Sequence, residues 1–203
     1  MPDFRKDFNF LGITLRDWPE GMVGRFSGKR LIICAGAACI WDDLALLGIR
    51  KEESNTHFMA VNDVVMHLPM KVRHFYSNDH RMIPYWLGAR RPQYVLKHVP
   101  VEYTHSCRTG GQCTWPWPGH GTSTLGAVYS GLAMGYSPVI LCGCPLDDSP
   151  NYFSPSWEKR NFSREVADRI DGRIAYWSGA SRKCFKGRVK SMSGRTRELL
   201  GAP

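Results

Sequence analysis

The chain has 203 residues, of which 43% are hydrophobic and 22% charged, and its formal net charge is +9. This length and composition favour one globular domain and exclude wholesale disorder. The longest apolar run, 31–41, is about half of the roughly 20 residues that a membrane-spanning helix needs. The first ten residues mix acidic, basic and aromatic side chains, so we expect no secretory signal. The seven cysteines show no disulfide-framework spacing, which predicts free thiols in a reducing, cytoplasmic setting.

The positive charge is concentrated near the end of the sequence. Residues 151–203 carry 12 basic and 5 acidic side chains, whereas residues 1–150 carry 15 and 13. Within 182–197, seven basic side chains occur without an acid. This segment predicts either a solvated cationic tail or a contact with phosphate on a nucleotide, a nucleic acid or an anionic lipid.

Short apolar runs in the first half predict buried strands. The run 31–36 ends in glycine, which is typical of a strand covered on both faces. Asp42 or Asp43 is expected to cap the helix that follows. The further strands are predicted at 57–62, at 72–76 and, more weakly, at 94–96 and 99–101.

The second half begins with a loop and then shows the clearest unit of the sequence. Residues 105–120 contain too many Gly, Pro, Cys and Trp residues for regular structure. Thr122 to Thr124 are expected to cap a helix at 125–134, which Gly135 ends. Strands are predicted at 139–142 and 173–177.

Alternating short strands and helices predict an α/β fold: a single Rossmann-like domain with a mostly parallel sheet flanked by helices. We assign this domain to 1–180 and a basic C-terminal extension to 181–203. Ligands of such sheets bind beyond the carboxyl ends of the strands. The loops after Cys34, Val61, Tyr76 and Cys142 are therefore the candidate ligand site.

Two of these loops carry possible ligand-binding chemistry. The small residues around Gly36 and Ala37 allow a phosphate or ribose to approach the backbone, although close strand–helix packing requires small residues too. Neither a dinucleotide fingerprint nor a Walker lysine is present. Asp147 and Asp148 suit Mg²⁺, and they suit a solvated acidic turn equally.

The loop before the helix offers further candidates. His105, Cys107, Cys113 and His120 are of zinc-ligand type, but the C-x5-C spacing departs from that of structural zinc sites. His120 is the best-placed histidine base, and a structural or exposed role is the alternative. The Ser123 hydroxyl is expected to cap the helix, to contact a nucleotide, or to do both.

The segments 121–129, 133–136 and 139–143 resemble the central motif of bacterial lipooligosaccharide sialyltransferases. They also resemble the related domain of small phage proteins and of archaeal 6-hydroxymethylpterin pyrophosphokinases, and the resemblance extends from about residue 30 to 177. It implies a Rossmann-like fold, a bound cytidine nucleotide and, for a phage protein, the host cytoplasm. The implied nucleotide contacts are Asn62, Ser77 or Asn78, Ser123, Gly143 and, more loosely, Tyr152.

The resemblance and the polar loops together predict a transferase that uses a nucleotide-activated donor, foremost a nucleotide sugar. His120 or Asp147 would deprotonate the acceptor hydroxyl. The family's catalytic histidine follows the central motif, whereas the last histidine of this sequence is His120. A Mg²⁺-dependent pyrophosphokinase of a hydroxymethyl acceptor, with the metal on Asp147 and Asp148, is the first alternative. A non-catalytic module that binds a nucleotide or a nucleic acid is the second.

Two spatial expectations follow. Ser123 should lie beside Gly36 and Gly143 in one cleft. The basic segment should form a loop-rich flap, added to the sheet near its ligand edge, with Arg188 and Arg195 among its phosphate contacts.

Overall fold

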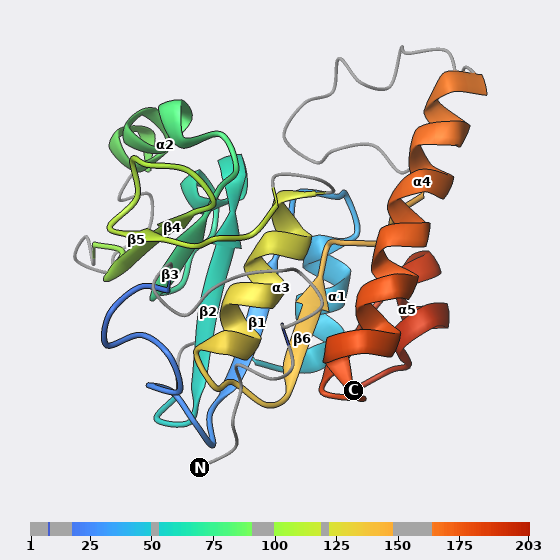
Figure 1. The fold of residues 1–203 in the computed structure, drawn as a ribbon, viewed down its shortest axis with the longest axis horizontal. Helices are drawn as coiled ribbons and strands as arrows, with labels where there is room; N and C mark the ends of the chain where they lie inside the picture. Colours follow the sequence, from blue (N-terminus) through green and yellow to red (C-terminus); the bar gives the residue numbers. More distant parts are fainter. Residues whose placement is uncertain (1–7, 9–17, 50–52, 91–99, 119–121, 148–163) are drawn as a thin grey trace.

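The protein folds around a parallel sheet, seen in the computed structural model, which describes residue 8 and residues 18–49, 53–90, 100–118, 122–147 and 164–203. Within these residues the sheet has seven strands in the order β5-β4-β3-β2-β1-β6-β7 (Figure 1), and every pairing is parallel. Strand β1 is central, and the chain continues on one side of it through β2 to β5 and on the other through β6 and β7. The strands are β1 (Arg30–Cys34), β2 (Thr56–Val61), β3 (His74–Tyr76), β4 (Tyr103–Ser106), β5 (Cys113–Thr114), β6 (Val139–Cys142) and β7 (Val189–Ser191).

Helices cover both faces of the sheet (Figure 1). Helices α3 and α4 share one hydrophobic cluster, and α1 and α2 belong to the cluster on the opposite face. No helix among the described residues combines the length and the apolar character needed to cross a membrane. The helices are α1 (Ile40–Leu47), η3 (Asn62–Met66), η4 (His80–Met82), α2 (Ile83–Ala89), α3 (Ser123–Ala133), α4 (Arg164–Ala180), η6 (Ser181–Phe185) and α5 (Gly194–Leu200).

The central strands form because both of their faces are apolar. All side chains of β2 and β6 are buried, and so are four of the five in β1. Leu31 and Ile33 point into the cluster that contains α3, whereas Ile32 and Cys34 point into the cluster that contains α1. This pattern is typical of a parallel sheet covered on both sides, and it confirms the predicted α/β class.

Several predicted elements agree with the structure. The strands predicted at 31–36, 57–62, 72–76 and 139–142 correspond to β1, β2, β3 and β6. The Thr122 hydroxyl caps α3 by accepting the Leu125 N–H at 3.2 Å. After α3, Gly135 takes a left-handed φ of 93°, which ends the helix.

Four local predictions are wrong. Residues 105–120 are not a loop throughout, because Cys113–Thr114 form the edge strand β5, which pairs with β4. Asp42 and Asp43 lie in the first turn of α1 rather than at its cap, which is Cys39. The fourth strand is Tyr103–Ser106, later than the predicted 99–101, and 94–96 lies outside the described residues. Residues 173–177 belong to helix α4 and not to a strand.

The reason for the last error is a short apolar run inside a longer helical pattern. The run that contains Ile174, Tyr176 and Trp177 reads as a strand when it is taken alone. The buried positions Ile170, Trp177, Ala180 and Cys184 are spaced by seven, three and four residues, which is helical spacing.

The basic segment is part of the sheet, so the prediction of a loop-rich flap added to it is wrong. Strand β7 lies within 182–197 and pairs with β6, with Val189 opposite Val139 and Ser191 opposite Leu141. Val189 and Ser191 are buried, and the neighbouring cations Arg188 and Lys190 are only partly exposed. The alternation of the buried positions Val189 and Ser191 is difficult to recognise in the sequence, because basic residues surround both.

Helix α3 packs unusually close to the sheet at its glycines. A β-carbon at Gly126 would overlap the Tyr76 hydroxyl and lie 2.6 Å from Cζ of the same buried ring. A β-carbon at Gly131 would lie 2.7 Å from Cδ2 of Leu31. Small residues at these positions therefore allow the whole helix to be buried.

We expect Gly126→Ala to destabilise the fold by about 1–3 kcal/mol, because the Tyr76 ring is enclosed and cannot move away. Gly172→Ala is the matched control: it also lies inside a helix, but nothing is within 4 Å of its β-carbon position. This control should stabilise the protein by up to about 1 kcal/mol through helix propensity. Urea unfolding measures both changes, and equal effects of the two substitutions would contradict the packing argument.

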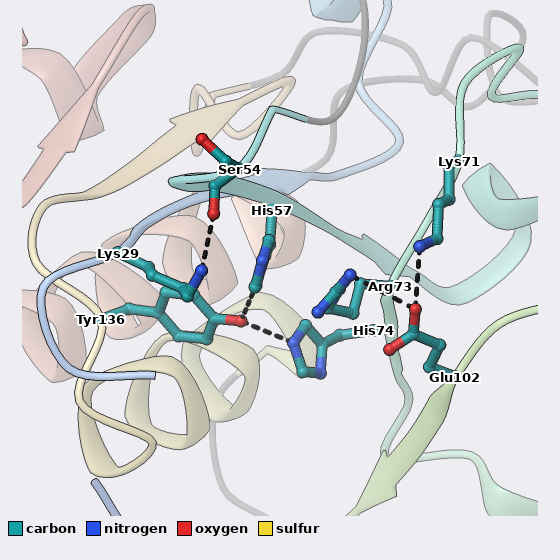
Figure 2. Close-up of polar contacts among 8 residues, drawn as sticks. All are labelled: Lys29, Ser54, His57, Lys71, Arg73, His74, Glu102 and Tyr136. Carbon is teal, nitrogen blue, oxygen red and sulfur yellow. Dashed lines mark hydrogen bonds and ion pairs between the residues drawn. The ribbon is translucent and has the colours of Figure 1, made fainter. Parts of the chain in front are cut away.

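A chain of buried polar side chains crosses the face of β2, β3 and β4 (Figure 2 shows its members His74, Tyr136 and His57). The Trp115 indole donates to Nδ1 of His105 at 3.1 Å, so neutral His105 carries its proton on Nε2 and donates to Nδ1 of His74 at 3.0 Å. His74 then donates to the Tyr136 hydroxyl at 2.7 Å, and this hydroxyl donates to Nδ1 of His57 at 2.5 Å. Because an indole is only a donor, this proton order is the one that satisfies all five side chains in their neutral forms.

We expect this chain to make the stability of the protein depend on pH. Burial lowers the pKa of His57 to about 4 and that of His105 to about 3, and it lowers the pKa of His74 as well. The unfolded chain therefore binds more protons below about pH 6.5, so stability is lost as the pH falls from about 6.5 toward 4, by up to about 1.4 kcal/mol per pH unit for each histidine.

Denaturant unfolding between pH 7.5 and 4.5 measures this slope. His57→Gln should reduce it, whereas His67→Gln, an exposed histidine outside the chain of contacts, should retain the wild-type slope. A wild-type stability that is constant over this range would contradict the interpretation.

Candidate functional site

The candidate site lies at the carboxyl edge of the sheet, where the strand order changes direction. Strand β1 pairs with β2 on one side and with β6 on the other, so the loops that follow β1 and β6 diverge from adjacent strands. This is the place at which open parallel sheets bind their ligands. Helix α3 begins at the same edge and contacts β1, β2, β3 and β6.

One half of the site is built by the ends of β2 and β3. The Ser77 hydroxyl donates to Oδ1 of Asn62 at 2.8 Å and accepts the Asp79 N–H at 3.0 Å. The Asn78 N–H donates to the Ser123 hydroxyl at 3.2 Å, which joins the β3 turn to the first turn of α3. Four predicted contact residues are therefore brought together in this half: Asn62, Ser77, Asn78 and Ser123.

The other half is built by the ends of β1 and β6. The Ala37 N–H donates to the Gly143 carbonyl at 3.1 Å. Gly143 has a φ of 68°, and a β-carbon there would overlap the Ala35 carbonyl and lie 2.8 Å from Cβ of Ile40. Only glycine fits this position, because both the left-handed backbone and the space exclude a side chain. Gly36 and Ala37, both partly exposed, remain at the surface of this half.

A buried carboxylate holds this second half together. Asp43 is 3% exposed, and its Oδ2 accepts the Gly143 N–H at 2.8 Å and the Ser193 hydroxyl at 2.8 Å. Ser193 is the residue that precedes α5, so the carboxylate connects α1, β6 and α5. The Cys39 thiol lies 3.8 Å from the same oxygen.

The first turn of α3 connects the two halves. Ser123 binds the Asn78 N–H, and the next residue, Thr124, hydrogen-bonds the thiol of Cys144, which follows Gly143. The predicted residues of the β1, β2, β3 and β6 loops thus lie around one helix end.

The remaining predicted residues are placed differently. Arg188 lies at the opposite, amino edge of the sheet, where its guanidinium donates to the Cys184 carbonyl at 2.8 Å. Arg195 lies in the first turn of α5 near the carboxyl edge, but its Nη1 lies 2.8 Å from Oδ1 of Asp171. Asp147 follows β6 and is partly exposed. Its charge contributes to the raised pKa of the Cys39 and Cys144 thiols. Three predicted residues lie outside the described part of the chain: His120, Asp148 and Tyr152.

A hollow of about 370 Å³ opens at Asn78, the residue whose N–H donates to the Ser123 hydroxyl. It lies where the β3 turn faces the loop after β4, and it brings two guanidinium groups and a histidine to the carboxyl edge. Its lining residues are Asn78, Asp79, His80, Arg81 and Arg108.

The thiols at this edge are unsuited to nucleophilic catalysis. Burial raises the pKa of Cys34 and of Cys144 to about 12, and it raises the pKa of Cys142 further. Because the thiolate is the nucleophile, these cysteines stay protonated and act as small apolar side chains at neutral pH.

The described residues do not assemble the zinc site that the sequence left open. Within them, no group of three or more His, Cys, Asp or Glu side chains has a metal-binding arrangement. Both ring nitrogens of His105 are engaged, one with Trp115 and one with His74, so His105 is not available as a zinc ligand. For magnesium, Asp147 is the described member of the predicted pair.

Sequence reasoning missed four residues of this edge. The sequence predicts Asp42 or Asp43 as a helix cap, and no local signal distinguishes the buried acceptor Asp43 from its exposed neighbour Asp42. Arg81, Arg108 and His80 lie in two separate polar loops, and no local motif connects these loops.

We expect Asp43→Ala to destabilise the protein by about 2–4 kcal/mol, because it leaves the Gly143 N–H and the Ser193 hydroxyl without their charged acceptor. Asp42→Ala is the matched control, since Asp42 is the exposed acid in the same helical turn. Its loss should be below about 1 kcal/mol, the usual size of a helix-dipole contribution. Chemical denaturation compares the two, and a similar small loss for both would contradict the role of Asp43.

Comparisons with known proteins assign no family to this chain. No protein-family model, no curated protein and no solved structure matches the chain. The resemblance of 121–143 to the sialyltransferase motif therefore stays a prediction from the sequence.

Proposed function

We propose that this protein binds a nucleotide at the carboxyl edge of its sheet and transfers a group from a nucleotide-activated donor, foremost a nucleotide sugar. The observation that carries the proposal is the placement of Ser123. This residue begins an eleven-residue buried helix at the switch in strand order, and its hydroxyl contacts the backbone of the β3 turn.

The first turn of α3 supplies the chemistry for a phosphate. Free N–H groups at a helix N-terminus point outward, and the helix dipole favours negative charge there. The small residues Gly36 and Ala37 at the same edge allow a ligand to approach the backbone. A phosphate next to Ser123 would therefore be bound by backbone donors and by the serine hydroxyl.

Asn62 suits the nucleoside part of the ligand. Its Oδ1 accepts the Ser77 hydroxyl, which fixes the orientation of the amide and directs the NH₂ group elsewhere. Asn62 is partly exposed, so this donor group can reach a carbonyl oxygen of a base or a ribose hydroxyl.

Group transfer further requires a base for the acceptor and charge stabilisation for the leaving phosphate. Asp147 at the end of β6 and His80 in the hollow are the described candidates for the base, and His120 is the candidate from the sequence. The base would take the proton of the acceptor hydroxyl as its oxygen attacks the donor. Arg81 and Arg108 would stabilise the charge on the departing phosphate.

The basic segment favours a nucleotide over a nucleic acid as the ligand. Arg188 and Arg197 donate to backbone carbonyls, and Arg195 pairs with Asp171. Cations engaged in this way help to hold β7 and α5 in place and are less available for a long phosphate backbone.

The first test measures binding of CMP, UMP and AMP by thermal shift and calorimetry. The second measures release of the nucleotide from the corresponding nucleotide sugars. A nucleotide at about 100 times its Kd should stabilise the fold by about 2.7 kcal/mol. Ser123→Ala should weaken binding about tenfold, the effect of losing one charge-assisted hydrogen bond.

Ser54→Ala is the matched control, because Ser54 is exposed at the opposite edge of the sheet and should leave the affinity unchanged. Asn62→Gly removes the amide while keeping the left-handed backbone, whose φ is 58°, and should also weaken binding. Absence of binding for every nucleotide and nucleotide sugar would overturn the proposal.

A further inference from the structure

The position and the charge of the hollow lined by Asn78, Asp79, His80, Arg81 and Arg108 bear on which ligand the proposed site takes. Its walls come from two separate segments, the turn after β3 and the loop after β4. Both segments follow strands at the carboxyl edge, and the first of them contacts the first turn of α3 through Asn78 and Ser123.

The two guanidinium groups of the hollow lack internal partners. Some basic side chains elsewhere are paired: Lys71 and Arg73 with Glu102 (Figure 2), and Arg195 with Asp171. Within the described part of the chain, Arg81 and Arg108 form no ion pair.

The charge of the lining is positive. Two guanidinium groups outweigh the one carboxylate, that of Asp79, so the hollow attracts an anion. Planar guanidinium groups bind phosphate oxygens in pairs, which makes arginine well suited to this task.

The walls of the hollow are fixed by contacts outside it. The Cys107 thiol donates to Oδ1 of Asn78 at 3.3 Å, and the Asn78 N–H binds Ser123. Behind His80 the loop after β4 comes close, because a β-carbon at Gly110 would lie 3.2 Å from both Cβ and Cδ2 of His80. Asn78 thus belongs both to the hollow and to the contact with α3.

We propose that this hollow binds a second phosphate, so that the ligand of the site is a nucleoside diphosphate or its derivative rather than a nucleoside monophosphate. The inference rests on the proposed nucleotide site: α3 would bind the phosphate nearest the nucleoside, and the hollow would bind the next. Inorganic pyrophosphate offers the same chemistry without the nucleoside.

The test compares matched ligands by calorimetry at low salt: UMP with UDP, CMP with CDP, and inorganic pyrophosphate. The wild-type protein should bind the diphosphate of the preferred nucleoside at least about tenfold more tightly than its monophosphate. In the double variant Arg81→Gln/Arg108→Gln this ratio should fall to about one, while the affinity for the monophosphate changes little.

The control is Arg173→Gln/Arg182→Gln, which removes the same charge from two exposed positions on α4 and η6. It should keep the diphosphate preference, and this separates a local site from the overall charge. Melting temperatures without ligand should agree between all three proteins, since the substituted side chains are exposed.

Three outcomes are decisive. Equal affinity for monophosphate and diphosphate in the wild-type protein, or a preference that survives in the double variant, overturns the second phosphate site and leaves the nucleotide site intact. Pyrophosphate binding that the double variant loses, without binding of any nucleotide, supports the hollow as a phosphate site and overturns the proposed nucleotide function. Failure of every phosphate ligand overturns both.

Discussion

The close approach of α3 to the sheet is the contact on which the candidate site depends. Gly126 and Gly131 let the helix lie directly on Tyr76 and Leu31, so that nearly all of its side chains are buried. A helix fixed in this way has a fixed first turn, which brings Ser123 and Thr124 between the loops of β3 and β6. A side chain at Gly126 would push the helix away from the sheet and would separate these loops.

A second constraint works from the other face of the sheet. The Asp43 carboxylate binds the Gly143 N–H and the Ser193 hydroxyl, and so connects α1 with the end of β6 and the start of α5. A buried charge of this kind is costly unless several donors surround it. Its partners come from segments about 100 and 150 residues away, so this contact closes the half of the site next to β1.

The histidines of the protein differ in their roles according to their positions in the fold. His57, His74 and His105 form a neutral hydrogen-bonded chain in the core, ordered by a tryptophan that can only donate. His80 instead lines the hollow beside two arginines, where a ligand can reach it. A histidine base for the proposed transfer is therefore to be sought at the carboxyl edge and not in the core.

The sequence by itself determined the α/β class, the central strands and the cap of α3, because these follow from local patterns. The apolar runs at 31–36, 57–62 and 139–142 have the length and the composition of buried strands, and Thr122 caps the helix through its own neighbours. The polar residues at the strand ends were also predictable, since parallel strands end at a common edge.

The tertiary structure alone decided the rest, because the deciding contacts join distant segments. Strand β7 forms because Val189 and Ser191 pair with residues of β6 that lie 50 positions earlier in the sequence. This pairing outweighs the cations that surround the two residues. Residues 173–177 are helical because Trp177 is buried on the same helix face as Ala180, which a five-residue window does not reveal. Likewise, Arg81 and Arg108 line one hollow only because β3 and β4 lie side by side.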